Sequence, residues 1–125
     1  MKSMKALART LVCVAISILL SVGINLAPAA AQTIEVKMGA DNGMLVFVPS
    51  NIEASPGDTI TWINNKLGPH NAVVEGQPKL SQKQLLFKTG DSYTTEIPSD
   101  QASGSYTFYC EPHRGAGMQG KLIIK

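Results

Sequence analysis

The sequence predicts an all-β protein, a Greek-key β-sandwich of seven to eight strands. Three observations lead to this prediction. From Thr33 onward, short runs of alternating or β-branched residues recur at near-regular spacing. Turn residues separate these runs, as in Ser55-Pro56-Gly57-Asp58. The chain has 125 residues, which leaves room for one compact domain and little besides.

Most of the expected strands follow from a simple residue pattern. Residues 34–38 alternate apolar and polar side chains, and residues 59–63 are β-branched or aromatic. Residues 78–88 are the exception, because Leu80 and Gln84 lie at helical spacing and allow a short helix or an irregular crossover. The other strands are expected at Leu45–Val48, Ile52–Ala54, Ala72–Val74, Tyr93–Ile97, Gly104–Cys110 and Lys121–Ile124.

The N-terminus has the layout of a secretory signal peptide. A basic stretch precedes an uncharged apolar run from Leu11 to about Leu26, and Ala29-Ala30-Ala31 offers small residues for cleavage. The alternative is a permanent membrane anchor, because the run approaches the roughly 20 residues that span a bilayer. We expect residues 1–31 to be a removed signal or transit peptide, and residues 32–125 to form the functional domain.

Removal of that segment changes both the charge and the cysteine count. Lys2, Lys5 and Arg9 leave with it, so eight Lys and Arg remain against nine Asp and Glu, a formal net charge of −1. This balance is unlike that of a nucleic-acid-binding protein. Cys13 leaves too, and Cys110 then has no partner for an intrachain disulfide. A lone thiol in an oxidising compartment is exposed to oxidation unless a metal ion or another group occupies it.

The strand that leads to Cys110 predicts where its side chain points. Side chains alternate between the two faces of a strand, so Tyr106, Phe108 and Cys110 share one face and Tyr109 lies on the other. If Phe108 belongs to the core, Cys110 points inward at the end of the sandwich. Tyr109 then points outward.

Cys110 opens a cluster of metal-binding side chains. His113 and Met118 follow on a glycine-containing loop, and His70 lies on a loop between two expected strands. Thiolate and thioether donors stabilise Cu(I), imidazole binds both oxidation states, and together they form the ligand set of an electron-transfer copper site. We expect one copper ion, Cu(II)/Cu(I), with the ligands His70, Cys110, His113 and Met118.

Other chemistries fit these residues less well. Structural zinc needs four Cys or His ligands, and the expected domain offers three. Covalent haem needs Cys-x-x-Cys-His, which the sequence lacks. A copper oxidase or nitrite reductase needs further copper centres, and the two histidines of the chain are already used, so we expect no enzyme. A copper-delivery or storage protein stays an alternative, although it would expose labile Cys and Met ligands.

Three segments of the chain carry a family resemblance. Residues 109–118 closely resemble the copper loop of plastocyanins, which are cupredoxins, and residues 64–71 resemble their first-histidine loop. Residues 39–50 resemble a segment near their mature N-terminus, so the similarity covers residues 33–125. It implies a soluble, monomeric carrier of the thylakoid lumen, peripheral to the membrane, that takes single electrons from cytochrome f of the cytochrome bf complex to photosystem I. A periplasmic pseudoazurin-like carrier for another redox enzyme is the alternative.

The resemblance also assigns roles around the copper ligands. His113 is expected to present its ring edge to solvent within an apolar docking face, and Tyr109 matches an outward aromatic of a second contact area. Asn71 matches the residue that ties the two ligand loops together, and Arg114 adds a positive charge beside the copper loop, as in cyanobacterial members. The residues that match the docking face are Leu45, Gly68, Pro69, Pro112 and Ala116.

The chain departs from plant members in the charge near Tyr109. Plant plastocyanins carry acidic clusters there, whereas the short segment 75–88 of this chain holds Lys79, Lys83 and Lys88 against a single acid, Glu75. These lysines either only solvate the surface or indicate that partner steering does not depend on a negative patch.

Overall fold

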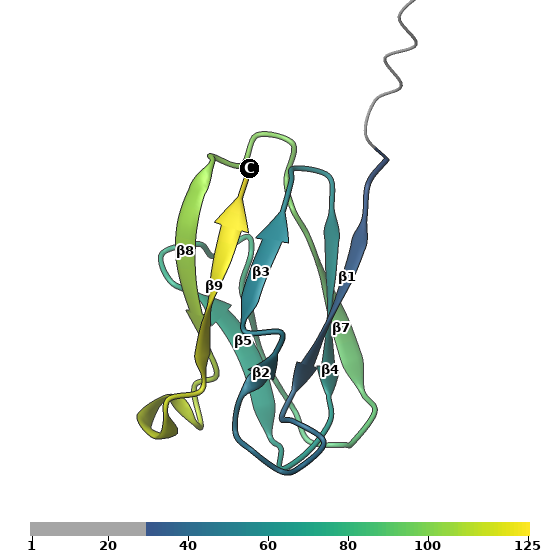
Figure 1. Cartoon of the computed structure of the whole chain (residues 1–125), viewed down its shortest axis with the longest axis vertical. Coiled ribbons are helices and arrows are strands. Elements are labelled where there is room, and N and C mark those ends of the chain that lie inside the picture. Colours follow the sequence, from purple (N-terminus) through teal and green to yellow (C-terminus); the bar gives the residue numbers. More distant parts are fainter. Residues whose placement is uncertain (1–29) are drawn as a thin grey trace, which may run out of the picture.

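The computed structural model describes residues 30–125, and Figure 1 shows them as two β-sheets packed face to face. The predicted all-β sandwich is therefore confirmed. The expected signal peptide at residues 1–31 lies almost entirely outside the described residues. Within residues 30–125, no helix has the length and apolar character needed to cross a membrane.

Nine strands and one short 3-10 helix make up the described part of the chain, so the structure has one strand more than the sequence predicted. The additional strand is β6. In order, the elements are β1 (Thr33–Met38), β2 (Phe47–Val48), β3 (Asn51–Ala54), β4 (Thr59–Asn64), β5 (His70–Val74), β6 (Gln82–Leu86), β7 (Ser92–Glu96), β8 (Gly104–Tyr109), η1 (Arg114–Ala116) and β9 (Gln119–Ile124).

The two sheets have the strand orders β2-β1-β4-β7 and β3-β9-β8-β5-β6. β1 pairs with β4 in parallel, and β3 pairs with β9 in parallel, while the other pairs are antiparallel. Each parallel pair joins strands that lie far apart in the sequence, which requires crossing connections instead of hairpins. These crossings bring the ends of β1, β4 and β8 to the same end of the sandwich, opposite the C-terminus (Figure 1).

An aromatic core lies directly beneath that end. Phe47, Trp62 and Phe108 contact one another edge to face, with ring centroids 4.8 to 5.9 Å apart. Such pairs add about 0.5–1.5 kcal/mol each to the stabilisation from burial. Cys110 and Met118 belong to the same buried cluster, so the metal-binding end of the sandwich is continuous with its core.

The segment 78–88 is where the sequence pattern misled. Instead of a short helix or an irregular crossover, the chain makes a turn and then forms β6. In the turn, the Ser81 hydroxyl accepts a hydrogen bond from the Val74 N–H and lies within hydrogen-bonding distance of the Gln77 carbonyl. β6 pairs with β5, and the side-chain amide of Gln82 donates to the Thr94 carbonyl of β7. A helix of this length has marginal stability by itself. The pairing of β6 with β5 therefore prevails over the helix that the spacing of the residues allowed.

Candidate metal centre

Three of the four expected ligands meet at the end of the sandwich. Cys110 Sγ lies 3.6 Å from His70 Nδ1 and 3.5 Å from His113 Nδ1. The donor atoms of the three residues all lie within 4.8 Å of one another. The centroids of the two imidazole rings lie 5.0 Å apart, and the ring planes make an angle of 60°. Both rings direct the same nitrogen, Nδ1, toward the sulfur.

These distances fit a single first-row metal ion. A metal bonded to sulfur at about 2.3 Å and to nitrogen at about 2.0 Å, at a tetrahedral angle, holds those two atoms about 3.5 Å apart. The distances from Cys110 Sγ to the two imidazole nitrogens have this size. A thiolate with two imidazoles is the donor set that suits copper in both oxidation states. The residues present therefore fit one copper ion.

His70 is held from behind by the backbone. It is buried at the start of β5, and its Nε2–H donates to the carbonyl of Lys66, which leaves the lone pair of Nδ1 directed at the centre. Burial lowers the pKa of His70, the hydrogen bond to Lys66 raises it, and the neighbouring His113 lowers it further. The lowered pKa favours the neutral ring, which is the form that binds a metal.

The Lys66 carbonyl is itself fixed by the loop after β1. Gly39 has a φ of +89°, and a Cβ at this position would run into the Lys66 carbonyl oxygen. Asn65 reinforces this contact, because its side-chain amide donates to the Gly39 carbonyl at 2.9 Å and its N–H donates to the Met38 carbonyl. The position of His70 thus depends on a close backbone approach that only glycine permits.

Cys110 follows the last residue of β8 and is fully buried, as strand alternation predicted, while Tyr109 is partly exposed. Burial raises the pKa of the Cys110 thiol, and hydrogen bonds from the backbone of Asn71 and His113 oppose this rise. The side chain of Asn71 accepts from the Glu111 N–H at 2.9 Å and donates to the Lys83 carbonyl at 3.0 Å. Asn71 therefore joins the two ligand loops, as the resemblance implied. A bound metal ion would deprotonate the buried thiol.

Met118 is brought beside Cys110 by backbone hydrogen bonds. The Cys110 N–H donates to the Met118 carbonyl at 3.1 Å, and the Met118 N–H donates to the His113 carbonyl at 3.2 Å. Between them, η1 and the left-handed Gly117 reverse the chain. Met118 is fully buried and belongs to the same core cluster as Cys110.

The expected docking residues surround this centre with different exposure. Gly68, Pro112 and Ala116 are exposed, while Pro69 is half-buried. Leu45 is also half-buried, and it packs against the hydrophobic core instead of standing free on the surface. His113 is half-buried, in contrast to the fully buried His70. The chain thus covers one histidine and leaves the other within reach of solvent.

Sequence reasoning missed exposed apolar side chains at this end, among them Leu67 and Met44. Leu67 is 62 % exposed and has a φ of 53°, an uncommon backbone conformation for leucine, and Met44 is 57 % exposed. A Cβ at Gly43 would lie 3.9 Å from the Leu67 side chain, so the loops that carry Met44 and Leu67 touch. The available signal for the exposure of Leu67 was its position directly before Gly68-Pro69-His70. A turn that leads into a metal ligand has little freedom to bury the leucine side chain.

A Greek-key sandwich with two imidazoles and a thiolate gathered at one end defines the class of small one-copper proteins. Comparison with known proteins specifies the family. Residues 34–125 match the family described as copper binding proteins, plastocyanin/azurin family, and the chain belongs to it.

Individual relatives agree with this assignment. The chain is 45 % identical to a plastocyanin of Nostoc punctiforme over 107 residues, which cover 78 % of this chain and 77 % of the relative. It is 37 % identical to a plastocyanin of Prochlorothrix hollandica, with 82 % and 80 % covered. Among solved structures, oxidised plastocyanin of Dryopteris crassirhizoma superimposes with a TM-score of 0.61 at 29 % identity, covering 73 % of this chain and 99 % of that one. The protein is thus a blue-copper electron carrier with one copper ion.

Proposed function

We propose that this protein carries single electrons from cytochrome f of the cytochrome bf complex to photosystem I. The observation that carries the proposal is the arrangement of His70, Cys110 and His113 in a chain that closely resembles cyanobacterial plastocyanins. Met118 completes the proposed ligand set as the weak axial donor. The exported domain comprises residues 32–125, and residues 1–31 direct it to the thylakoid lumen, where it stays a soluble monomer loosely associated with the membrane.

The side chains around the centre are suited to electron transfer. A bound copper ion supplies one electron by alternating between Cu(I) and Cu(II). His70 is fixed by Lys66, and Cys110 by backbone hydrogen bonds from both ligand loops, so neither donor needs to move when the charge changes. His113 is the one histidine of the pair that reaches solvent, and its ring provides the shortest route to a partner. No substrate is converted, so the protein is a carrier and not an enzyme.

The surface around His113 is suited to brief contact. Gly68, Pro69, Pro112 and Ala116 form a polar-poor face, and the exposed side chains of Leu67 and Met44 extend it. Redox encounters are small and weak, because a carrier must dissociate after every transfer. A small apolar face of this kind, with the charge of Arg114 beside it, provides such a contact.

Copper loading tests the proposed ligands. Addition of Cu(II) to the purified domain 32–125 is expected to produce an intense blue thiolate-to-copper band that a reductant bleaches reversibly. Cys110→Ser removes the thiolate and should abolish the band. A band retained in Cys110→Ser would show that other residues bind the copper.

Transfer kinetics test the proposed partners. The reduced protein should react with purified photosystem I in a second-order process, and reduced cytochrome f should reduce the oxidised protein in the same way. Arg114→Glu should leave the blue band intact and slow the reaction with photosystem I most strongly at low salt, where charges are least screened. If the protein forms the blue band but reacts with neither partner, it would be a carrier for another redox enzyme, as a pseudoazurin-like protein is.

A further inference from the structure

Arg114 does not extend freely from the copper loop. Its guanidinium lies over the ring of Tyr109, with Cζ 3.8 Å from the ring centroid. One guanidinium nitrogen lies 3.7 Å from Glu75 Oε1, within ion-pair distance. Arg114 follows His113 directly, Tyr109 precedes Cys110, and Glu75 follows β5, so the contact links the copper loop to the flank of the sandwich. The cation is thus folded back against the molecule.

The contact is weak enough to exchange. The side chains of Arg114 and Glu75 are 50 % and 61 % exposed, and ion pairs of this exposure contribute little because water screens them. An arginine over an exposed aromatic ring contributes a similarly small amount. Neither contact would prevent the guanidinium from moving to a carboxylate on another protein. The free energy of the two contacts together is what that movement must overcome.

We propose that Glu75 is a specificity-determining residue of the partner surface: it competes with carboxylates of an acidic partner for the guanidinium of Arg114. The partner chemistry that fits is a protein surface with exposed Asp or Glu beside its redox group. Docking then exchanges one carboxylate for another, and Glu75 weakens the complex and hastens its release. The inference rests on the proposed role of Arg114 as a contact residue.

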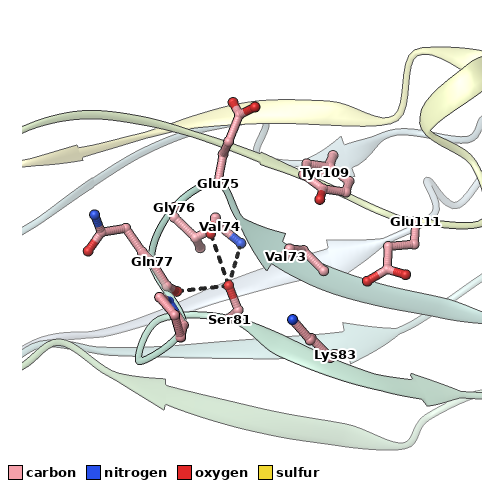
Figure 2. Close-up of a pocket in the computed structure, with 10 residues that line it drawn as sticks. Val73, Val74, Glu75, Gly76, Gln77, Ser81, Lys83, Tyr109 and Glu111 are labelled. Carbon is pink, nitrogen blue, oxygen red and sulfur yellow. Dashed lines mark hydrogen bonds between the residues drawn. The ribbon is translucent and has the colours of Figure 1, made fainter.

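The surroundings explain why Glu75 is the carboxylate that pairs with Arg114. A hollow of about 330 Å³ separates the turn after β5 from the end of β8, with Glu75 and Tyr109 along one side and Lys83 opposite (Figure 2). Glu111 also lines the hollow, but the ion pair found with Arg114 is that of Glu75. Because the segment from Glu75 to β6 is short and otherwise lysine-bearing, it brings no second carboxylate to the guanidinium.

Oxidation by a small anion tests the proposal without any protein partner. The reduced, copper-loaded protein is oxidised by hexacyanoferrate(III) at low ionic strength, and the second-order rate constants of Glu75→Gln and Glu53→Gln are compared. Glu53 is a matched control, because it is 62 % exposed and pairs with one cation, Lys125, at the far end of β9. Both variants lose one negative charge. Glu75→Gln should exceed Glu53→Gln by about two- to fivefold, the range that one exposed ion pair allows.

The Arg114→Gln background separates competition from simple repulsion of the anion. Without the guanidinium, Glu75→Gln should accelerate the reaction no more than Glu53→Gln does. An excess that persists in Arg114→Gln would mean that Glu75 acts on the probe directly, and this result would overturn the proposal. Equal rates for the two single variants in the native background would overturn it as well.

A binding measurement provides a readout that needs no electron transfer. The redox-inert, paramagnetic hexacyanochromate(III) anion is titrated into the Cu(I) protein, and the broadening of the Arg114 side-chain resonances is followed by NMR. Glu75→Gln should broaden them at an anion concentration about two- to fivefold lower than Glu53→Gln. Equal concentrations would contradict the competition. The metal-free protein can be titrated in the same way, so a failure of copper loading stays distinguishable from a failure of this inference.

Discussion

The two histidines of the metal centre do different work with the same chemical group. His70 is fully buried, and a backbone carbonyl fixed by a neighbouring loop holds its outer nitrogen. His113 is half-buried on a short loop that ends in a 3-10 turn. The fold therefore fixes the ring of His70 in the interior, whereas it leaves the ring of His113 accessible to solvent. The difference teaches that a carrier needs a rigid donor for its copper and an accessible donor for its partner, and that burial assigns these roles.

Removal of each ring is the strongest way to test that comparison. His70→Gly and His113→Gly should each lower copper affinity by about 100-fold or more, since even outer contacts of a metal site are worth about 10- to 100-fold. Added imidazole should restore the blue band of His113→Gly, because its vacated position opens to solvent. It should not restore the band of His70→Gly, whose position is enclosed. Absorption spectra with increasing imidazole provide the measurement, and equal rescue of both variants would contradict the assigned roles.

A methyl group at Gly39 should destabilise the fold and disturb the buried histidine, His70. Gly39→Ala places a Cβ against the Lys66 carbonyl at a φ of +89°, and we expect a loss of about 2–4 kcal/mol in the free energy of unfolding. The blue band should shift, because Lys66 holds His70. Gly57→Ala is the control, since Gly57 has a φ of +93° and no atom within 4 Å of the added Cβ. It should cost about 1–2 kcal/mol and leave the spectrum unchanged. Denaturant unfolding and absorption spectra decide between them.

The smallest effect on the metal centre is expected for a substitution of Asp58, which lies at the opposite end of the sandwich. Hydrogen bonds from the backbone N–H groups of Gln32 and Ser55 hold the pKa of Asp58 below its usual range. Since the folded pKa is the lower one, this stabilisation is complete above the unfolded value of 3.8 and is lost as the pH falls through the folded pKa. Asp58→Asn should cost about 1–2 kcal/mol at pH 7, with a difference that shrinks below pH 3.8.

The blue band of Asp58→Asn should equal that of the native protein at pH 7, because the turn lies far from the copper end. Asp100→Asn, at an exposed position, is the control for loss of one negative charge. Thermal unfolding between pH 3 and pH 7 measures the difference. If the two variants lost the same stability at pH 7, the hydrogen bonds of Asp58 would contribute nothing beyond its charge.

How far the sequence could predict the molecule depended on the range of the interactions involved. Side-chain alternation in β8 is a local property, and it correctly placed Cys110 inward and Tyr109 outward. The helical spacing of Leu80 and Gln84 is local too, but there the pairing of β6 with β5 prevailed. The periodicity within residues 78–88 does not reveal that pairing, because the partner strand, β5, lies outside the segment.

The sequence by itself determined the kind of site: the residue types of His70, Cys110, His113 and Met118, and a strand pattern that brings loops to one end. The family resemblance already implied that His113 is the histidine that faces solvent. Only the tertiary structure decided how His70 is enclosed, that the exposed Leu67 extends the apolar face, and that Arg114 lies against Tyr109 and Glu75. Those features depend on contacts between segments distant in the chain, such as Gly39 with Lys66 and Glu75 with Arg114. Chemical identity is written residue by residue, whereas burial and pairing exist only after the sheets have packed.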